Sequence, residues 1–598
     1  MIARAVLAGA PLVLVALLAT GCGCSQNQTG DPCSDPGLDC CNEDSDCWVP
    51  EAPGYMECCL VTNECIELPD EAGEEDDGCE PGSSCDSVND VLLVQGETEE
   101  DGCYVDWSCC EPRDPLSQGK IGTYSSMGIA ADGTVWLSGY AAGVTETSLY
   151  GDLASATWNE AAGEPDWELL DGIPWDAVPY APPDGWRGGI NEPGDDVGLY
   201  TSLALNGSDE PRIAYHDHTN GALKYIAMDG GAWADPAVAD GDGHAGEWAS
   251  MALVSGDVPV VAYRAHSVSM EDYTGASYQV GHAISSVRYA EAGDASGSSW
   301  TVEEVARSSA PCWGTVCPED HRCRVADGLC WPENRAGEGC LDEMDAYSCA
   351  AEEACLELLD GAGAPLGTYG CEEAVSEDPV FDLPEGIGLW TSLAFAPDGS
   401  PEIVYYDRTR GELVWVEHDG TGWASPVVLD GDDLSTDTDL HGDRGWHASL
   451  TIDSAGTRHI SYVDGLAEAL MYMQVDPDGT VAVREVVDDG ATGGADHDLV
   501  GDYSTVVVDG DGRVRLAYQN TSQGLIMMAV RSTSDGSWTI STLSDPDAGF
   551  MGYYLDQVLV GETSWFSQFT FNYELDPFYR GLRVISCTVD TDDTATCG

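Results

Sequence analysis

Short apolar segments separated by tight polar turns recur along most of this chain. The stretch 388–430 shows the pattern most clearly, with apolar segments at Leu389–Ala396, Glu402–Tyr406, Glu412–Glu417 and Trp423–Leu429. Asp and Gly fill the turns between them, because Asp bonds its own backbone and Gly tolerates positive φ. Segments this short, with partial alternation of apolar and polar positions, predict an antiparallel sheet of four strands. Both faces of such a sheet are apolar, so it needs a neighbouring sheet on each side.

The same unit is repeated, and each repeat opens with glycine, any residue, an aromatic residue, any residue and serine. The motif begins at Gly122, Gly198, Gly246 and Gly388, and looser versions begin at Gly445, Gly501 and Gly552. Gly246 follows Gly198 by 48 residues, and the last three glycines follow at intervals of 57, 56 and 51. A period of about 50 residues with four strands per unit is typical of a β-propeller. We therefore predict an all-β, seven-bladed propeller. The alternatives are six blades, because the last unit is degenerate, and an open β-solenoid.

Three further positions repeat in step with this motif. Second segments carry a tyrosine near their end, third segments carry Leu or Val, and fourth segments open with tryptophan. These residues are Tyr215, Tyr263, Tyr405, Tyr462 and Tyr518; Leu223, Val287, Leu413, Leu470, Leu525 and Leu582; and Trp167, Trp233, Trp300, Trp423 and Trp538. We interpret the three columns as packing between sheets. The serines of the opening segments are interpreted as small residues that let strands crowd the axis, not as nucleophiles; they are Ser202, Ser250, Ser392 and Ser449.

The first 21 residues predict an export signal. Arg4 precedes an apolar run from Ala5 to Ala19, which at about 15 residues is short for a membrane-spanning helix. The segment Leu18-Ala-Thr-Gly-Cys22 resembles the lipobox of bacterial lipoproteins. This resemblance implies acylation of Cys22 and an exported protein held on the bacterial outer membrane or cell surface. Cys24 is a second possible acylation site, and an ordinary cleaved secretory signal is the alternative.

Two regions are rich in cysteine and poor in apolar residues. Residues 22–115 form an acidic stalk whose twelve cysteines after Cys24 predict small disulfide-bonded loops. Residues 310–385, with eight cysteines, form an insertion that divides the propeller into blades 1–3 (116–309) and blades 4–7 (386–598). Disulfides are favoured over zinc because adjacent Cys-Cys pairs replace Cys-x-x-Cys and export reaches an oxidising compartment. Cys587 and Cys597 flank a turn and are expected to bond to each other.

The chain is strongly acidic, with 107 Asp and Glu against 22 Lys and Arg. Phosphates would be repelled, so we expect no nucleic-acid partner. The charge has a simple interpretation as solvation of an exported or salt-adapted protein. A sharper hypothesis is Ca²⁺, since hard oxygen ligands cluster between predicted blades. The candidate ligands are Asp240, Asp242, Asp437, Asp439, Asp496 and Asp498.

One face of the predicted propeller receives most of the unusual residues. The loops between strands two and three and those between blades emerge on the same face, and function usually resides on such loops. This face would carry the segments Ile173–Val197 and Arg264–Ser286 and the cysteine-rich insertion. The candidate ligand-binding residues are Trp175, Tyr180, Trp186, Tyr273, Tyr278, His216, Asp217, Asp407 and Asp464. Packing of the aromatic residues within their loops and turn capping by the three aspartates are the simpler interpretations.

The repeats resemble sialidase-like (BNR) propellers over about residues 119–590. The Asp-box of that family is approached by Ser534-Asp-Gly-Ser-Trp538 and Asp419-Gly-Thr-Gly-Trp423. The resemblance implies the fold, but no catalytic residue is carried over, because the arginine triad and the Tyr-Glu pair have no counterpart here. We expect a monomeric binding or adhesion module for a glycan or a surface protein. A glycan-cleaving hydrolase, which would need two nearby carboxylates, and an envelope assembly scaffold are the alternatives.

Overall fold

A computed structural model describes most of the chain beyond residue 116. It covers residues 117–597, together with the short strands β1 (Met56–Cys59) and β2 (Glu64–Glu67). The gaps in this description are 145–148, 159–164, 176–185, 191–192, 273–277, 310–316, 318–320, 325–326, 334–348, 350–352, 361–363, 376–383, 432–442, 492–496, 545–549 and 573–578. The chain divides into two compact units, of which one comprises 118–144, 149–173 and 193–598.

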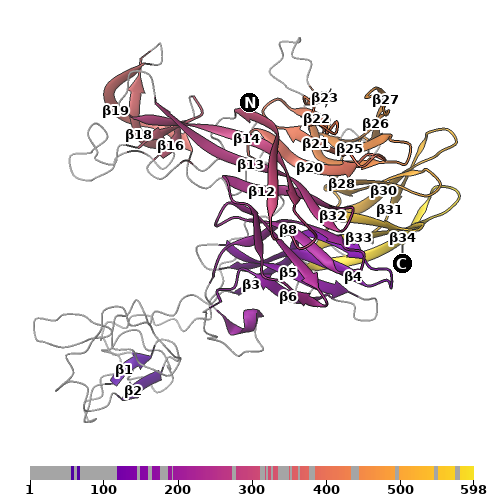
Figure 1. The fold of residues 1–598 in the computed structure, drawn as a ribbon, viewed down its shortest axis with the longest axis horizontal. Helices are drawn as coiled ribbons and strands as arrows, with labels where there is room; N and C mark the ends of the chain where they lie inside the picture. Colours follow the sequence, from indigo (N-terminus) through magenta and orange to yellow (C-terminus); the bar gives the residue numbers. More distant parts are fainter. Residues whose placement is uncertain are drawn as a thin grey trace, which may run out of the picture. The chain divides into compact units, whose positions relative to one another are not determined.

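Seven antiparallel sheets of sequential strands make up this unit (Figure 1). The prediction of an all-β, seven-bladed propeller is confirmed. The blades are β3–β6 (Ser117–Ile129, Val135–Val144, Leu149–Trp158, Asp166–Asp171), β7–β11 (Val197–Leu205, Pro211–Asp217, Ala222–Asp229, Ala232–Trp233, Ala237–Asp240), β12–β15 (His244–Val254, Val258–Asp272, Gln279–Ala292, Trp300–Ser309), β20–β23 (Ile387–Phe395, Pro401–Asp407, Glu412–Glu417, Val427–Asp430), β24–β27 (Arg444–Ile452, Arg458–Asp464, Ala469–Val475, Val481–Asp488), β28–β31 (Val500–Val508, Val514–Asn520, Leu525–Arg531, Trp538–Thr542) and β32–β35 (Phe550–Val560, Thr563–Asn572, Tyr579–Val589, Ala595–Cys597). The described residues contain no α-helix, so none of them forms a helix able to span a bilayer.

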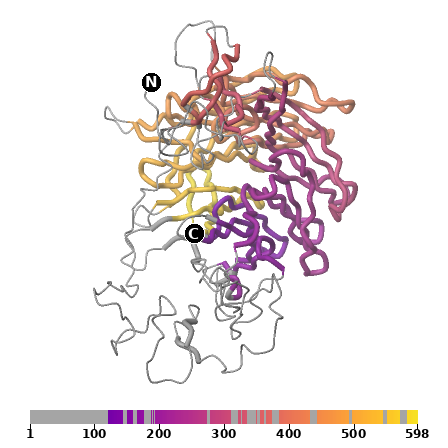
Figure 2. The backbone as a smooth tube through the Cα atoms, turned by 90° about the vertical axis from the view of Figure 1, so that its left-hand side faces the viewer, coloured from indigo at the N-terminus to yellow at the C-terminus, as the bar shows by residue number. Residues whose placement is uncertain are grey.

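The ring closes by packing blade 7 against blade 1. The rings of Trp158 and Trp565 lie 6.5 Å apart, and the Ser125 hydroxyl donates to the Tyr554 carbonyl oxygen at 3.2 Å. Figures 1 and 2 both show the yellow strands of blade 7 beside the purple strands of blade 1. Every blade therefore has a neighbour on both faces, which its two apolar faces require. The six-bladed and open-solenoid alternatives are excluded.

The apolar core lies between successive blades and uses the predicted columns. The tyrosines Tyr215, Tyr263, Tyr405, Tyr462 and Tyr518 and the third-strand Leu and Val residues are all buried. The tryptophan column is less regular than predicted. Trp423 precedes β23, forming an isolated bridge with His418, and its ring packs on Tyr289 of the preceding blade at 5.3 Å. The fourth strand therefore begins four residues later than expected, because this tryptophan serves the interface between blades.

The cysteine-rich insertion extends the sheet of blade 3. Strand β14 pairs with β17 (Leu329–Pro332), and the sheet goes on through β16 (His321–Arg324), β19 (Pro365–Val375) and β18 (Glu353–Leu359). These four strands form an arm seen at the upper left of Figure 1. Our prediction of a long loop at 264–286 is wrong. β13 and β14 stay paired as far as Asp272 and Gln279, because Val, Ala and Ser residues at 258–272 and 279–292 continue the strand pattern. Cys317–Cys330 and Cys349–Cys371 are disulfides within the arm.

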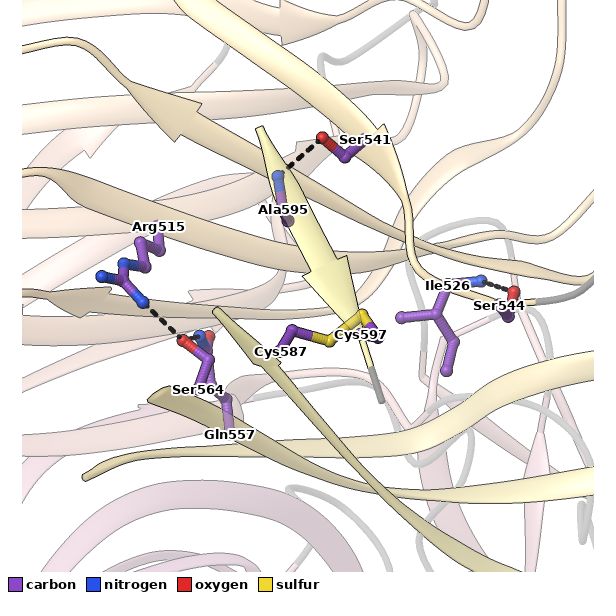
Figure 3. Close-up of a disulfide and its surroundings, with 9 residues drawn as sticks. All are labelled: Arg515, Ile526, Ser541, Ser544, Gln557, Ser564, Cys587, Ala595 and Cys597. Carbon is purple, nitrogen blue, oxygen red and sulfur yellow. Dashed lines mark hydrogen bonds between the residues drawn. A yellow bond between two sulfur atoms is a disulfide. The ribbon is translucent and has the colours of Figure 1, made fainter. Parts of the chain in front are cut away.

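The predicted disulfide between Cys587 and Cys597 is confirmed (Figure 3). It joins β34 to β35, the last and shortest strand of blade 7, through directly opposed residues. The Ala595 amide of β35 also donates to the Ser541 hydroxyl of blade 6 at 3.1 Å. The disulfide and this contact hold a strand that is too short to be secured by its own ladder of hydrogen bonds.

Candidate functional site

Seven aromatic side chains, one from the first strand of each blade, form a closed ring around the propeller axis. They are Tyr124, Tyr200, Trp248, Trp390, His447, Tyr503 and Tyr554. The centroids of neighbouring rings lie 4.9, 4.8, 6.2, 4.7, 4.8 and 5.3 Å apart in that order, and Tyr554 returns to Tyr124 at 4.7 Å. We call this ring the aromatic collar. Each member is the aromatic position of the repeated opening motif, and each is only partly buried.

The backbone of the motif turns each collar ring toward the axis. All seven collar residues have φ between 47° and 53°, and the glycine two positions before each has φ between 90° and 121°. The strand pairing shifts at these residues, for example between Leu389 and Ser392, so the first strand bulges there. A non-glycine residue at positive φ costs about 1–3 kcal/mol, and such strain gathers at functional sites. Because this backbone strain occurs in every blade, the collar is a regular feature of the fold.

Glycine is required two positions before the collar because successive blades approach closely there. A Cβ atom on Gly198 would lie 2.7 Å from the Leu153 Cα, and one on Gly388 would lie 3.1 Å from the Arg264 Cβ. Both distances are shorter than ordinary carbon–carbon contacts. The recurring glycine therefore both permits positive φ and lets the first strands meet at the axis.

The serine of the motif connects adjacent blades. Its hydroxyl accepts the backbone N–H of the next blade: Ser202 from Met251 at 2.9 Å, Ser250 from Leu393 at 3.1 Å, Ser392 from Leu450 at 3.0 Å and Ser449 from Val506 at 3.3 Å. At ring closure Asp556 replaces serine and accepts from the Met127 amide at 2.8 Å. The interpretation of these serines as structural residues near the axis agrees with this arrangement.

The interblade loops and the loops between strands two and three meet on one side of the collar, as the geometry of the repeat predicts. His218 donates its amide to the Asp196 carbonyl at 2.9 Å, and Thr521 donates to that of Leu499 at 2.8 Å. Arg408 and Gly465 make the same bond to the interblade loops before their blades. We call this side the loop face.

A cluster of ionisable side chains lies beside the collar on the loop face of blades 2 and 3. Four of the eleven histidines gather there around one ion pair. The members of this mouth cluster are His216, His218, His244, His266, Glu247 and Arg264. Glu247 immediately precedes the collar residue Trp248, and the Arg264 guanidinium lies 5.8 Å from the Trp248 ring centroid. His216 contacts the collar through Tyr200, with centroids 6.2 Å apart.

The mouth cluster holds its groups in definite protonation states. Burial opposes ionisation of Glu247 and would raise its pKa. The electrostatic attraction of Arg264 and His266 outweighs this effect and lowers the pKa well below the usual range. Burial lowers the pKa of His216, and burial with the nearby His266 lowers the pKa of His244 to about 4. His216 Nδ1 lies 2.8 Å from the Ala245 carbonyl oxygen and so carries the proton, while its buried Nε2 has no hydrogen-bond partner among the described residues.

A second carboxyl group, that of Asp196, lies close to the mouth cluster. Asp196 accepts a hydrogen bond from the Tyr140 hydroxyl at 2.8 Å and lies next to His218 in the loop face. Burial raises the pKa of this carboxyl. Asp196 and Glu247 both act electrostatically on the collar residue Tyr124. Two carboxyls near one aromatic ring therefore have pKa values displaced in opposite directions.

The aspartates predicted to bind ligand occupy turns on the loop face. Asp217 accepts the Asn220 amide at 2.8 Å, Asp407 accepts that of Arg410 at 3.2 Å, and Asp464 accepts that of Ala467 at 3.0 Å. All three are buried and also ion-paired, with Lys224, Arg410 and Arg444 respectively. The structure thus assigns them the capping role that was the simpler interpretation.

Of the predicted aromatic ligand residues, the side chains of Trp175 and Tyr278 are described, and they belong to different compact units. Trp175 is 95% exposed. Tyr278 packs in the arm, where its hydroxyl donates to Glu357 and its ring lies 6.1 Å from that of Trp331. Tyr180, Tyr273 and the side chain of Trp186 lie outside the described residues.

The described part of the proposed calcium ligand set is engaged by protein groups. Asp240 accepts from the Tyr263 hydroxyl and from Arg288 Nη1, both at 2.7 Å, and Asp498 accepts from Asn520 Nδ2 at 3.0 Å. Asp242 is exposed, and Asp437, Asp439 and Asp496 lie outside the described residues. No group of three or more His, Cys, Asp or Glu among the described side chains is arranged to hold a metal ion.

Sequence reasoning placed His216 on this face but did not predict the ion pair of Glu247 with Arg264 or the closed collar. The aromatic position of the opening motif was visible in the sequence and was used only to count blades. Its regular occurrence on the first strand was the available signal, because first strands line a propeller axis. Nothing in the spacing of His244, Glu247, Arg264 and His266 indicated their association, since it depends on the pairing of β12 with β13.

Comparison with known proteins found no family and only distant structural similarities. No protein-family model and no curated protein matches the chain. Among solved structures, the polysaccharide lyase Uly1 is similar with 7% identity and a TM-score of 0.38, over 77% of this chain and 88% of its own. The NanB sialidase from Streptococcus pneumoniae is similar with 10% identity and a TM-score of 0.26, over 70% of each chain. A puromycin hydrolase is similar with 11% identity and a TM-score of 0.33, and this chain spans 53% of its length. At TM-scores of 0.26 to 0.38, these similarities carry no argument about the fold or the activity of this chain.

Proposed function

We propose that this protein is an exported, lipid-anchored binding protein that takes a glycan at the aromatic collar, on the loop face. The observation that carries the proposal is the aromatic collar bordered by the mouth cluster. Sugar rings offer apolar C–H faces that pack on aromatic rings and hydroxyl groups that both donate and accept hydrogen bonds. Tyr200 and Trp248 supply the aromatic surface, and His216, His218 and Asp196 supply polar groups beside it.

The charge of the chain supports a ligand with few negative charges. With 107 acidic and 22 basic residues, the protein repels polyanions at a distance, whereas a mainly neutral polysaccharide is unaffected. Most described arginines near this face are already paired, for example Arg264 with Glu247 and Arg444 with Asp464. A ligand that presents neutral hydroxyl groups therefore best matches the aromatic collar and the mouth cluster.

A glycan array, probed with and without EDTA, tests this function. Trp248→Ala is expected to weaken binding to any glycan hit by at least about tenfold, because stacking on an aromatic ring is lost. Trp538→Ala is the matched control, since Trp538 opens β31 of blade 6, packs on Tyr472 of β26 in blade 5, and should leave binding unchanged. Binding that survives EDTA would remove the calcium hypothesis. An array without hits would contradict the glycan proposal and favour a surface or envelope protein as partner.

The pair Asp196 and Glu247 favours a second candidate, a glycan-cleaving enzyme. One carboxyl with a raised pKa can supply a proton while another remains ionised, which is the division of roles that glycoside hydrolysis uses. Incubation of array hits with the protein should then release new reducing ends. Asp196→Asn and Glu247→Gln should each abolish that release. Bound but intact glycan would leave the binding function alone.

Export and anchoring are proposed from the lipobox-like segment ending at Cys22, which lies outside the described residues. Expression of the full chain in a Gram-negative host should place it in the membrane fraction with an acylated Cys22. Cys22→Ala should release it in soluble form. Partition of both proteins with soluble proteins would contradict the anchor.

A further inference from the structure

The rings of the aromatic collar stand upright around the propeller axis. Rings whose planes are parallel to a sevenfold axis turn by about 51° from one blade to the next, whereas rings that lie across the axis are parallel to one another. The planes of neighbouring collar rings differ by 41° to 64°. The collar therefore surrounds the axis with upright rings and does not cover it with a flat layer.

The spacing of the rings sets the width of the collar. Seven centroids that lie 4.7 to 6.2 Å from their neighbours fit a circle of about 6 Å radius. Each collar residue is partly exposed, so solvent reaches the rings. A group on the axis would thus lie about 6 Å from all seven centroids at once, which is the distance within which the face of an aromatic ring attracts a cation.

A carboxylate beside the collar adds negative charge. Asp502 immediately precedes the collar residue Tyr503, accepts a hydrogen bond from Thr521 Oγ1 at 2.7 Å, and lies 3.5 Å from His447 Nε2 of the collar. Burial lowers the pKa of His447, so its imidazole is neutral at neutral pH and leaves the charge of Asp502 uncompensated. In the described part of the chain, no Lys or Arg side chain is ion-paired with Asp502. The collar is therefore a place where a positive charge is stabilised.

We propose that the aromatic collar binds one organic ammonium ion on the propeller axis, held by cation–π attraction to the ring faces and by the charge of Asp502. Alkylated ammonium groups are the ligands that cages of aromatic rings hold in proteins. The excess of acidic residues, 107 against 22 basic ones, attracts such a cation from a distance.

The ammonium ion can come from two sources, a free small cation or the amino group of a sugar within a bound glycan. The second source rests on the proposed glycan function. An amino sugar also presents neutral hydroxyl groups, so it meets the requirement for a ligand with few negative charges.

Calorimetric titration of the full-length protein with choline tests the site without any glycan. Choline should bind at least about tenfold more tightly than its uncharged isostere 3,3-dimethylbutan-1-ol, because the two differ in charge and hardly in shape. Asp502→Asn should reduce the preference for choline about threefold, since the counter-charge is lost. Equal affinity for the two compounds, or binding of neither, would overturn the proposal. An unchanged preference in Asp502→Asn would overturn the role of that carboxylate.

Substitutions at Trp390 separate the ring face from packing. Trp390→Leu should weaken choline binding by about tenfold and leave the weaker binding of the isostere almost unchanged, whereas Trp390→Phe keeps an aromatic face and should retain most of the affinity for choline. Trp538→Leu, in the fourth strand of blade 6, is the control and should bind choline as the wild-type protein does. Wild-type affinity for choline in Trp390→Leu, or equal losses in the Leu and Phe variants, would show that the collar face does not hold the cation.

Oligomers of glucosamine and of N-acetylglucosamine distinguish the two sources. They share rings and hydroxyl groups and differ in charge. At about pH 6, where a sugar amine is protonated, the glucosamine oligomer should bind about tenfold more tightly and compete with choline if the glycan supplies the ammonium ion. Choline binding without this preference would assign the collar to a free cation and overturn the glycan as source. A glycan array without hits would contradict the glycan function, and the choline titration would still decide the cation site.

Discussion

The hydroxyl of Tyr462 donates a 2.6 Å hydrogen bond to Asp430, the last residue of the fourth strand of the preceding blade. The same bond recurs from Tyr215 to Asp171, from Tyr263 to Asp240 and from Tyr518 to Asp488, at 2.6–2.7 Å. Each joins a buried second-strand phenol to a carboxylate across a blade boundary. These pairs complement the serine hydrogen bonds near the axis. Adjacent blades are therefore connected by polar contacts at two different distances from the propeller axis.

Replacement of Tyr462 by Phe should lower the free energy of unfolding by about 1.5 kcal/mol, since a buried hydrogen bond to a charged acceptor is lost. Asp430 keeps Arg444 and Arg484 as partners, which limits the loss. Tyr405→Phe is the matched control. Tyr405 occupies the same column but has no hydrogen-bonded carboxylate among the described residues, and its loss should stay below about 0.5 kcal/mol. Equal urea midpoints for the two variants would refute the role of the pair.

The glycine of the opening motif should be intolerant of a side chain for two separable reasons. Gly388→Ala places a Cβ 3.1 Å from Arg264 at φ 94°, so we expect a loss of about 3 kcal/mol from strain and crowding together. Gly399→Ala meets no atom within 4 Å at a similar φ of 90° and should cost only the strain, about 1 kcal/mol. Thermal unfolding of both variants measures the difference. A cost as large at Gly399 would show that close approach of the blades is unimportant.

The disulfide of the last strand should stabilise blade 7, because the cross-link lowers the conformational entropy of the unfolded chain. Cys587 and Cys597 are separated by 10 residues, a loop for which cross-linking contributes about 2.7 kcal/mol in the chain-entropy model. The double variant Cys587→Ser/Cys597→Ser should exchange the amide hydrogens of 595–597 faster and unfold at lower urea concentration. Removal of the arm disulfide by Cys317→Ser/Cys330→Ser is the control and should leave exchange in β35 unchanged. Unaltered protection of β35 in the first variant would contradict the prediction.

Mild acid should destabilise the protein through the mouth cluster. The pKa of His244 is about 4 in the folded state and near 6.5 in an unfolded chain, so between these values the unfolded state binds more protons. The free energy of unfolding therefore falls as the pH drops from about 6.5 to 4, by about 2 kcal/mol at pH 4.5 from this residue. Glu247 acts in the same direction at lower pH, because its pKa is depressed and its stabilisation disappears on protonation.

His244→Gln removes the titrating group and should flatten this part of the pH dependence. Urea unfolding of both proteins at about pH 7 and pH 4.5 provides the measurement. The wild-type protein should lose about 2 kcal/mol more than the variant over that interval. Parallel losses would show that His244 titrates normally.

The architecture was predictable because its cause is local and repeated. The motif at Gly388, the tyrosine at 405 and the leucine at 413 recur in step, and a sheet with two apolar faces leaves few alternatives to a ring. The Asp-Gly pairs at 171, 240 and 430 that mark the acceptors of the tyrosine bonds were equally visible, though their partners were not. The prediction at 264–286 was wrong because the polar residues there were interpreted as a loop. They belong to β13 and β14, which stay paired as far as Asp272 and Gln279.

The candidate site was predictable only in part. His216 was recognised on the loop face, whereas His244, Glu247, Arg264 and His266 become neighbours only when β12 pairs with β13. The collar needs all seven blades, because each ring contacts rings from sequence positions about 50 residues or more away. The sequence by itself determined most of the strands and turns and the seven opening motifs, since these follow from short-range patterns. Closure of the ring, the collar and the protonation states at its mouth were decided by the tertiary structure, because they depend on distances between side chains that no local pattern encodes.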